Sequence, residues 1–65
     1  MVTTVTIIKG RDRGNKVVPF KNQARASRHA HALALTFGTE PVRDGQHFTV
    51  NGAAYFDTLD ARYAS

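Results

Sequence analysis

The first hydrophobic segment, Thr3–Ile8, has the alternation that is typical of a β-strand. All six of its residues are β-branched, which favours extended backbone over helix. Alternation places Val5 and Ile7 on one face of the strand and the neighbouring threonines on the other. The pattern therefore predicts a strand with one buried face.

The second predicted strand, Lys16–Phe20, follows a segment rich in turn-forming residues. Gly10–Asn15 contains two glycines, an aspartate and an asparagine, which favour tight backbone reversal. Pro19 cannot donate a ladder hydrogen bond, so it indicates an edge position or a strand end. Together the two segments predict an antiparallel hairpin with a basic loop.

The next fifteen residues, Gln23–Phe37, predict a helix because they contain no glycine or proline and are rich in alanine. Asn22 is suited to cap the first turn, and Gly38 is suited to end the helix. At 100° per residue, five apolar residues gather in one stripe that we expect to face the sheet. They are Ala26, Ala30, Leu33, Ala34 and Phe37.

The last third of the chain carries weaker strand patterns. Glu40–Arg43 suggests a short strand, and Gln46–Val50 suggests a longer one. The Asn51-Gly52 pair is a strong hairpin signal, because a type I′ turn needs positive φ at both central residues. Ala53–Asp57 is then expected to return as the partner strand, and Thr58–Ser65 to form a short helical turn or an irregular tail.

The elements together predict the α+β class, with residues 1–65 as a single domain. We expect an antiparallel sheet of four to five strands in the order ββαβββ, with one helix packed on one face. Sixty-five residues give a thin core, and the chain has no cysteine to reinforce it.

Charge is distributed unevenly along the chain. Residues 1–39 carry seven Lys or Arg residues and one acidic residue. Residues 40–65 carry two Arg residues and four acidic residues. Such a division creates a directional electrostatic field. We therefore expect a basic binding surface in the N-terminal half. The candidate contact residues are Lys9, Arg11, Arg13, Lys16, Lys21, Arg25, Arg28 and Tyr55.

Tyr55 joins this set because it is adjacent to Phe56 on the expected last strand. Neighbouring residues of a strand face opposite sides, so one of the two rings would lie on the helix-free face of the sheet. There it could stack on a base or enter a partner protein. A cross-strand aromatic pair is the structural alternative.

Other classes of function find little support in the sequence. His29 and His31 are two residues apart on a helix and cannot share one metal ion, and no serine has an evident base nearby. We expect neither catalysis nor a cofactor nor a metal. No apolar run approaches the roughly 20 residues that span a bilayer, and we expect no secretory signal, so the expected location is the cytoplasm.

A family resemblance rests on Val5–Lys9, the basic helix, and Thr49–Gly52 with Tyr55 and Asp57 after it. This order resembles small phage-encoded host-takeover proteins and is most similar to one family of type I-F anti-CRISPR inhibitors. The resemblance implies a single-helix, curved-sheet protein whose basic side chains occupy the DNA path of the CRISPR surveillance complex. The contact residues it implies are Lys9, Arg11, Arg13, Arg25 and Arg28.

Two hypotheses of function follow. In the first, the chain docks on an acidic surface of a nucleic-acid-processing complex in the host cytoplasm and blocks its nucleic-acid path. In the second, it binds DNA or RNA directly through the basic loop and helix. A weaker third is an assembly protein that pairs through a sheet edge. Both a monomer and a homodimer are compatible with the sequence. The basic loop and the basic helix face could form either a single patch or two separate patches.

Overall fold

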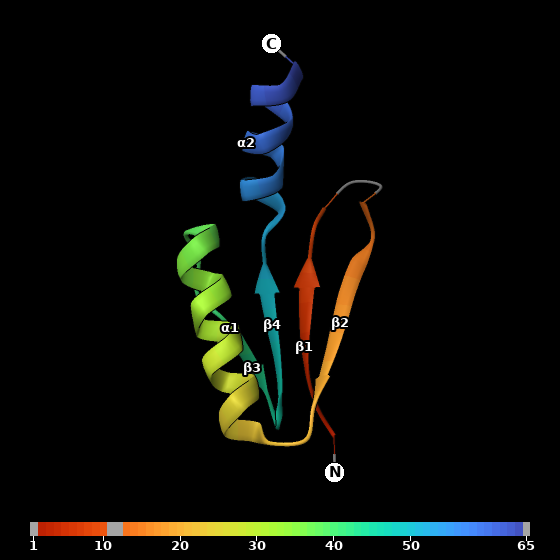
Figure 1. The fold of residues 1–65 in the computed structure, drawn as a ribbon, viewed down its shortest axis with the longest axis vertical. Helices are drawn as coiled ribbons and strands as arrows, with labels where there is room; N and C mark the ends of the chain where they lie inside the picture. Colours follow the sequence, from red (N-terminus) through yellow and green to blue (C-terminus); the bar gives the residue numbers. More distant parts are fainter. Residues whose placement is uncertain (1, 11–12, 65) are drawn as a thin grey trace.

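The computed structural model describes residues 2–10 and 13–64 and places them in a four-stranded sheet with two helices (Figure 1). The predicted α+β class is confirmed, with the order ββαββα instead of ββαβββ. The elements are β1 (Thr3–Ile8), β2 (Asn15–Phe20), α1 (Gln23–Phe37), β3 (Val42–Asp44), β4 (His47–Asn51) and α2 (Ala53–Ala64).

The sheet has the strand order β2-β1-β4-β3, so β2 and β3 form its edges. The pairs β1–β2 and β3–β4 are antiparallel, as the sequence predicts. The central pair, β1–β4, is parallel, with Val5 beside Phe48 and Ile7 beside Val50. The sheet is therefore mixed. Helix α1 leads into β3, and the turn after β3 makes β4 run in the direction of β1.

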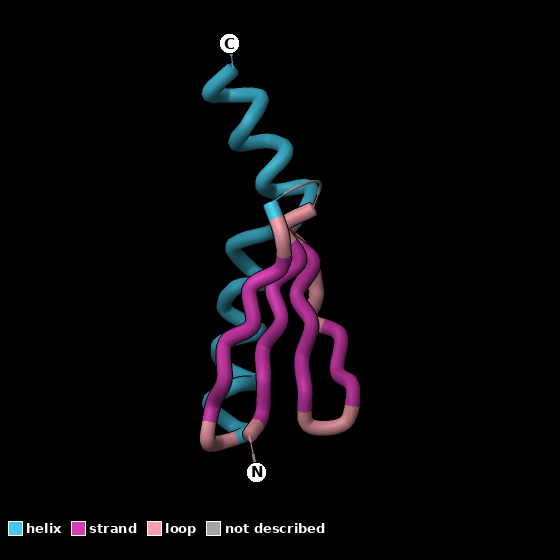
Figure 2. Tube along the Cα trace, turned by 90° about the vertical axis from the view of Figure 1, so that its right-hand side faces the viewer, coloured by secondary structure: helices cyan, strands magenta, loops and turns pink. Residues whose placement is uncertain are grey.

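Helix α1 covers one face of the sheet and leaves the other open (Figure 2). Ala26, Ala30 and Ala34 are buried against β1 and β4, where Val5 and Val50 are wholly buried. The small side chains let the helix backbone approach the strands closely. The predicted stripe is confirmed, with Leu33 and Phe37 partly buried at its margin.

Both predicted ends of α1 are confirmed. The Asn22 Oδ1 atom accepts hydrogen bonds from the N–H groups of Ala24 and Arg25, at 2.7 and 3.4 Å. Gly38 closes the helix in the left-handed conformation at φ 70°, which glycine adopts without a steric penalty.

The predicted strand Ala53–Asp57 is wrong, because this segment begins α2. The Gly52 N–H donates to the Ile8 carbonyl at 2.8 Å and so extends the parallel β1–β4 pairing. Gly52 is not among the glycines with positive φ, so the type I′ turn does not form. Instead, Asn51 Oδ1 accepts from the Ala53 N–H at 3.0 Å, and the Gly52 carbonyl accepts from Phe56.

Helix α2 continues from β4 and projects beyond the end of the sheet (Figure 1). It takes the place of both the expected fifth strand and the irregular tail, and it gives the molecule an elongated shape of 44 × 21 × 15 Å. Neither α1 nor α2 is long and apolar enough to cross a membrane. The Val-Asn-Gly hairpin on which the family resemblance partly rested is a strand-to-helix junction here.

Candidate binding surfaces

The first candidate surface is the exposed face of α1, on the side away from the sheet. Arg25, Arg28 and Leu35 are exposed on it, and Lys21 is exposed just before the helix. Leu35 is 84% exposed, the highest value among the large hydrophobic side chains that the structure describes. We call Lys21, Arg25, Arg28 and Leu35 the α1 surface.

The charges of the α1 surface lie where they do not stabilise the helix. Arg25 is in the first turn, at the positive end of the helix dipole, where a cation is unfavourable, and Lys21 lies just before the Asn22 cap. The first turn has no acidic residue, and the last turn has no basic one. Helix stability favours acidic residues in the first turn and basic residues in the last. The cations of the α1 surface therefore do not contribute to the stability of α1.

In the basic loop, Arg13 contacts helix α2 and the loop backbone. The Arg13 side chain is only 19% exposed and forms ion pairs with Asp57, at 3.2 Å, and with Asp60 of α2. It also donates to the Lys9 carbonyl at 3.0 Å. Arg11 lies outside the described residues.

Lys9 and Lys16 occupy the same end of the molecule as Arg13. The Lys9 ammonium lies 5.8 Å from the centre of the Phe56 ring, a cation–π contact with α2. Lys16 is exposed and pairs with Ile7, so it is on the helix-covered side of the sheet. Lys9 and Arg13 thus hold α2 in place.

The loop and the α1 surface do not form one patch. Lys16 is near the start of β2, and Lys21 follows its end. Five residues of extended strand separate them by roughly 17 Å. The predicted contact residues are therefore divided into two groups at opposite ends of the sheet.

Tyr55 is on α2 and not on the open face of the sheet, which corrects its expected position. Its ring is half-buried against Phe37, at a centroid distance of 4.9 Å, and against Phe56 at 5.4 Å. The aromatic cluster joins the end of α1 to the first turn of α2. A hollow of about 280 Å³ lies beside it, lined partly by Leu59.

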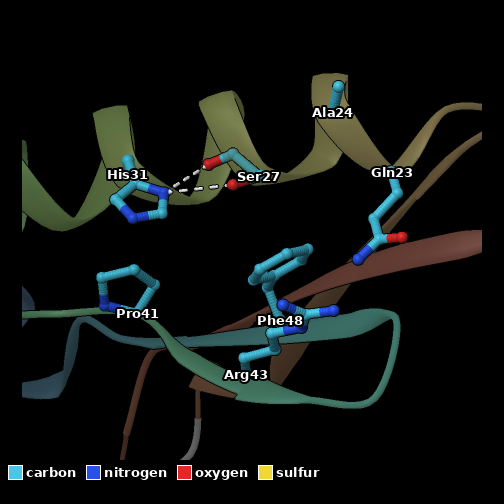
Figure 3. Close-up of a pocket in the computed structure, with 7 residues that line it drawn as sticks. All are labelled: Gln23, Ala24, Ser27, His31, Pro41, Arg43 and Phe48. Carbon is cyan, nitrogen blue, oxygen red and sulfur yellow. Dashed lines mark hydrogen bonds between the residues drawn. The ribbon is translucent and has the colours of Figure 1, made fainter.

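A second candidate surface, which the sequence did not reveal, is a cleft of about 520 Å³ between α1 and the edge strand β3 (Figure 3). Its two walls come from consecutive elements, which the chain reversal after α1 places opposite each other. None of the lining residues that the structure describes is acidic. They are Gln23, Ala24, Ser27, His31, Pro41, Arg43 and Phe48.

The hydrogen bonding of His31 fixes which ring nitrogen carries the proton. Nδ1 lies 2.7 Å from the backbone carbonyl of Ser27, and a carbonyl can only accept, so Nδ1–H is the donor. The Ser27 hydroxyl is 3.4 Å from the same nitrogen. Since Nδ1 holds its proton, it cannot act as a base toward Ser27. The acceptor Nε2 points into the cleft in Figure 3.

Arg43 provides the positive charge of the cleft. Its Nε–H donates to the Gly45 carbonyl at 2.7 Å, which holds the guanidinium in place at the β3–β4 turn. Its two terminal nitrogens make no hydrogen bond or ion pair within the part of the chain that the structure describes. They are donors available to a ligand.

His47 is held in the opposite tautomer to His31. The Thr4 backbone N–H donates to His47 Nδ1 at 3.1 Å, so this nitrogen is an acceptor. Over residues 2–10 and 13–64, no three His, Asp or Glu side chains gather in a way that could hold a metal ion.

Comparisons with known proteins identify no relative: no family model, no curated protein and no solved structure matches this chain.

Proposed function

We propose that this chain is a small, non-enzymatic binding protein whose α1 surface docks on an acidic surface of a nucleic-acid-handling complex and blocks its nucleic-acid path. The family resemblance suggests that it acts as an inhibitor encoded by a phage or mobile element, in the host cytoplasm. The observation that carries the proposal is the gathering of exposed cations and the exposed Leu35 on one face of α1, with Arg25 in the first turn, where a cation is unfavourable.

Leu35 favours a protein partner over bare nucleic acid. Protein interfaces combine an apolar centre with arginine, and their charged groups steer the encounter. Leu35 lies two turns after Arg28 on the same face and is 84% exposed. Exposed Ala24 and Ala32 lie on this face too and leave it flat enough for close contact.

Direct binding of DNA or RNA is the alternative, and the cations of the α1 surface themselves support it. Lys21, Arg25 and Arg28 would neutralise about three phosphates. The logarithm of the binding constant would then fall with the logarithm of salt concentration with a slope of about −2.7. A gel shift of the isolated chain on duplex and single-stranded DNA at several salt concentrations measures that slope.

The test of the protein partner uses the tagged chain as bait in a nuclease-treated host lysate. We expect recovery of a nucleic-acid-processing complex, reduced at least about tenfold by the pair Arg28→Gln and Leu35→Ser. The added oligonucleotide substrate of that complex should compete with the bait.

The matched control is the pair Lys16→Gln and Val17→Thr on β2, which removes the same charge and makes another exposed apolar side chain polar. Recovery that survives the α1 pair, or that falls equally with the β2 pair, would sink the proposed surface. Binding to bare DNA with the stated slope, without a protein partner, would favour the alternative.

A further inference from the structure

The cleft between α1 and β3 lies on the flank of α1, beside the α1 surface but distinct from it. It joins an edge strand to a helix, which is the arrangement by which several domains receive an extended peptide as an added strand. β3 is the outermost strand of its side of the sheet, and all three of its residues are exposed. An edge strand directs unpaired N–H and C=O groups outward, where they can pair with another chain.

The chemistry of the cleft selects the kind of segment that it would bind. Arg43 presents two terminal nitrogens, a fork that matches a carboxylate. His31 presents Nε2 as an acceptor, because its Nδ1–H is engaged by Ser27. Phe48 is the partner of Arg43 across the β3–β4 ladder and lies on the same side of the sheet, where its ring lines the cleft.

We propose that this cleft binds an extended peptide segment, added alongside β3, with an acidic side chain paired to Arg43 and a hydrogen-bond donor facing His31. The complementarity of charge carries the assignment, since Arg43 lines the cleft and none of the other described lining residues is acidic. The positive group is a side chain and not a row of backbone N–H groups. A C-terminal carboxylate is typically bound by a nest of backbone N–H groups. The guanidinium of Arg43 therefore fits the side chain of a Glu or Asp within a segment that passes through the cleft.

The proposal does not depend on the function of the α1 surface. Arg28 belongs to that surface and does not line the cleft, whereas Arg43 lines the cleft and is on another element. Substitutions at the two arginines therefore separate the two sites, and each removes one positive charge.

The experiment is a titration of the isotopically labelled chain with two hexapeptide pools, followed by NMR. Both pools are acetylated and amidated, so neither has charged ends. One has a fixed central Glu among randomised residues, and the other has Gln in its place. We expect the Glu pool to shift the amide signals of Ser27, His31 and Arg43 and to slow hydrogen exchange in β3.

Arg43→Gln should weaken the response to the Glu pool by about tenfold or more, because a charge-assisted bidentate contact is lost. Arg43→Lys should give an intermediate loss, since it keeps the charge without the fork. Arg28→Gln should leave the response within about twofold. The spectra themselves show that each variant is folded.

Three results would overturn the proposal. One is an equal response to the Glu and Gln pools, and another is a response centred away from the cleft or absent at millimolar peptide. The third is unchanged hydrogen exchange in β3 when the cleft signals shift, which would exclude strand addition.

Discussion

The two helices are attached to the same sheet by different kinds of contact. Helix α1 lies along the sheet, and three alanines of its inner face are buried against β1 and β4 (Figure 2). Helix α2 projects past the strand ends, and its first half and Asp60 contact the rest of the molecule. The first attachment is apolar packing over a long face, and the second combines close backbone approach, aromatic rings and ion pairs.

Several neighbours attach α2 to the rest of the molecule. Ala53 lies so close to Gly10 that a Cβ atom added there would be 2.8 Å from the Ala53 Cβ. Phe37 of α1 touches the rings of Tyr55 and Phe56. Lys9 lies over the Phe56 ring, and further along Arg13 forms ion pairs with Asp57 and Asp60.

These two kinds of attachment explain why two cations of the predicted basic loop contact α2. The buried alanines attach α1 to the sheet by apolar packing, which does not involve the cations on its outer face. The attachment of α2 is small and partly electrostatic, so it uses Arg13 and Lys9. A lopsided charge pattern in sequence can therefore serve an internal helix as well as an external partner.

The largest expected effect is the loss of the close α1–sheet contact in Ala30→Leu. Ala30 is wholly buried, so the added carbons have no room and should lower the free energy of unfolding by about 3 kcal/mol. Urea unfolding measures this change. The control Ala32→Leu adds the same atoms on the exposed side and should change stability by less than about 0.5 kcal/mol. Equal losses in both variants would contradict the apolar attachment of α1.

The next largest effect is expected from alanine substitutions at Gly10 and Gly14, which distinguish backbone strain from the close approach of Gly10 to Ala53 of α2. Gly10 and Gly14 both have positive φ, 77° and 73°, but only Gly10 has atoms within 4 Å of an added Cβ. Gly14→Ala should cost about 1 kcal/mol from strain alone, and Gly10→Ala about 2 kcal/mol. Only Gly10→Ala should shift the NMR signals of α2. Identical costs and spectra would show that the approach to Ala53 is unimportant.

A smaller effect is expected from Arg13→Gln, which removes the ion pairs to Asp57 and Asp60. These groups are partly exposed, so the loss should be about 1 kcal/mol or less. It should appear as faster hydrogen exchange in α2 with little change in the exchange of the sheet. Lys16→Gln removes the same charge from an exposed position and should leave α2 unchanged. Uniform exchange changes across the whole chain would mean that α2 is not a separate unit.

The smallest effect has the opposite sign. Arg25→Glu places an acid three residues after the Asn22 cap, at the positive end of the helix dipole. It should raise the free energy of unfolding by about 0.5–1 kcal/mol while abolishing binding by the α1 surface. The free energy of unfolding of Arg25→Gln should lie between those of the parent and of Arg25→Glu. A variant that is less stable than the parent would remove the argument that these cations are kept for binding.

Local chemistry determined much of this fold. The β-branched run of β1, the turn residues after it, and the capped alanine-rich helix are properties of short segments. They led directly to the observed hairpin and to the observed bounds of α1. The buried stripe of α1 also followed from the 3.6-residue period alone.

The Asn51-Gly52 pair shows where local chemistry was insufficient. The same two residues suit a hairpin turn or the start of a helix. Tertiary pairing decided between them, because the Gly52 N–H bonds to Ile8 on β1 and keeps the chain extended to that point. The alanines and aromatics that follow then continue as α2 instead of folding back.

The sequence by itself determined that the chain is α+β, where its first two strands and long helix lie, and that its N-terminal half is basic. Only the tertiary structure decided which cations remain at the surface and which hold α2, because that depends on Asp57 and Asp60 more than forty residues away. It also created the cleft of His31 and Arg43, since the walls of a cleft come from elements that meet only in the folded chain.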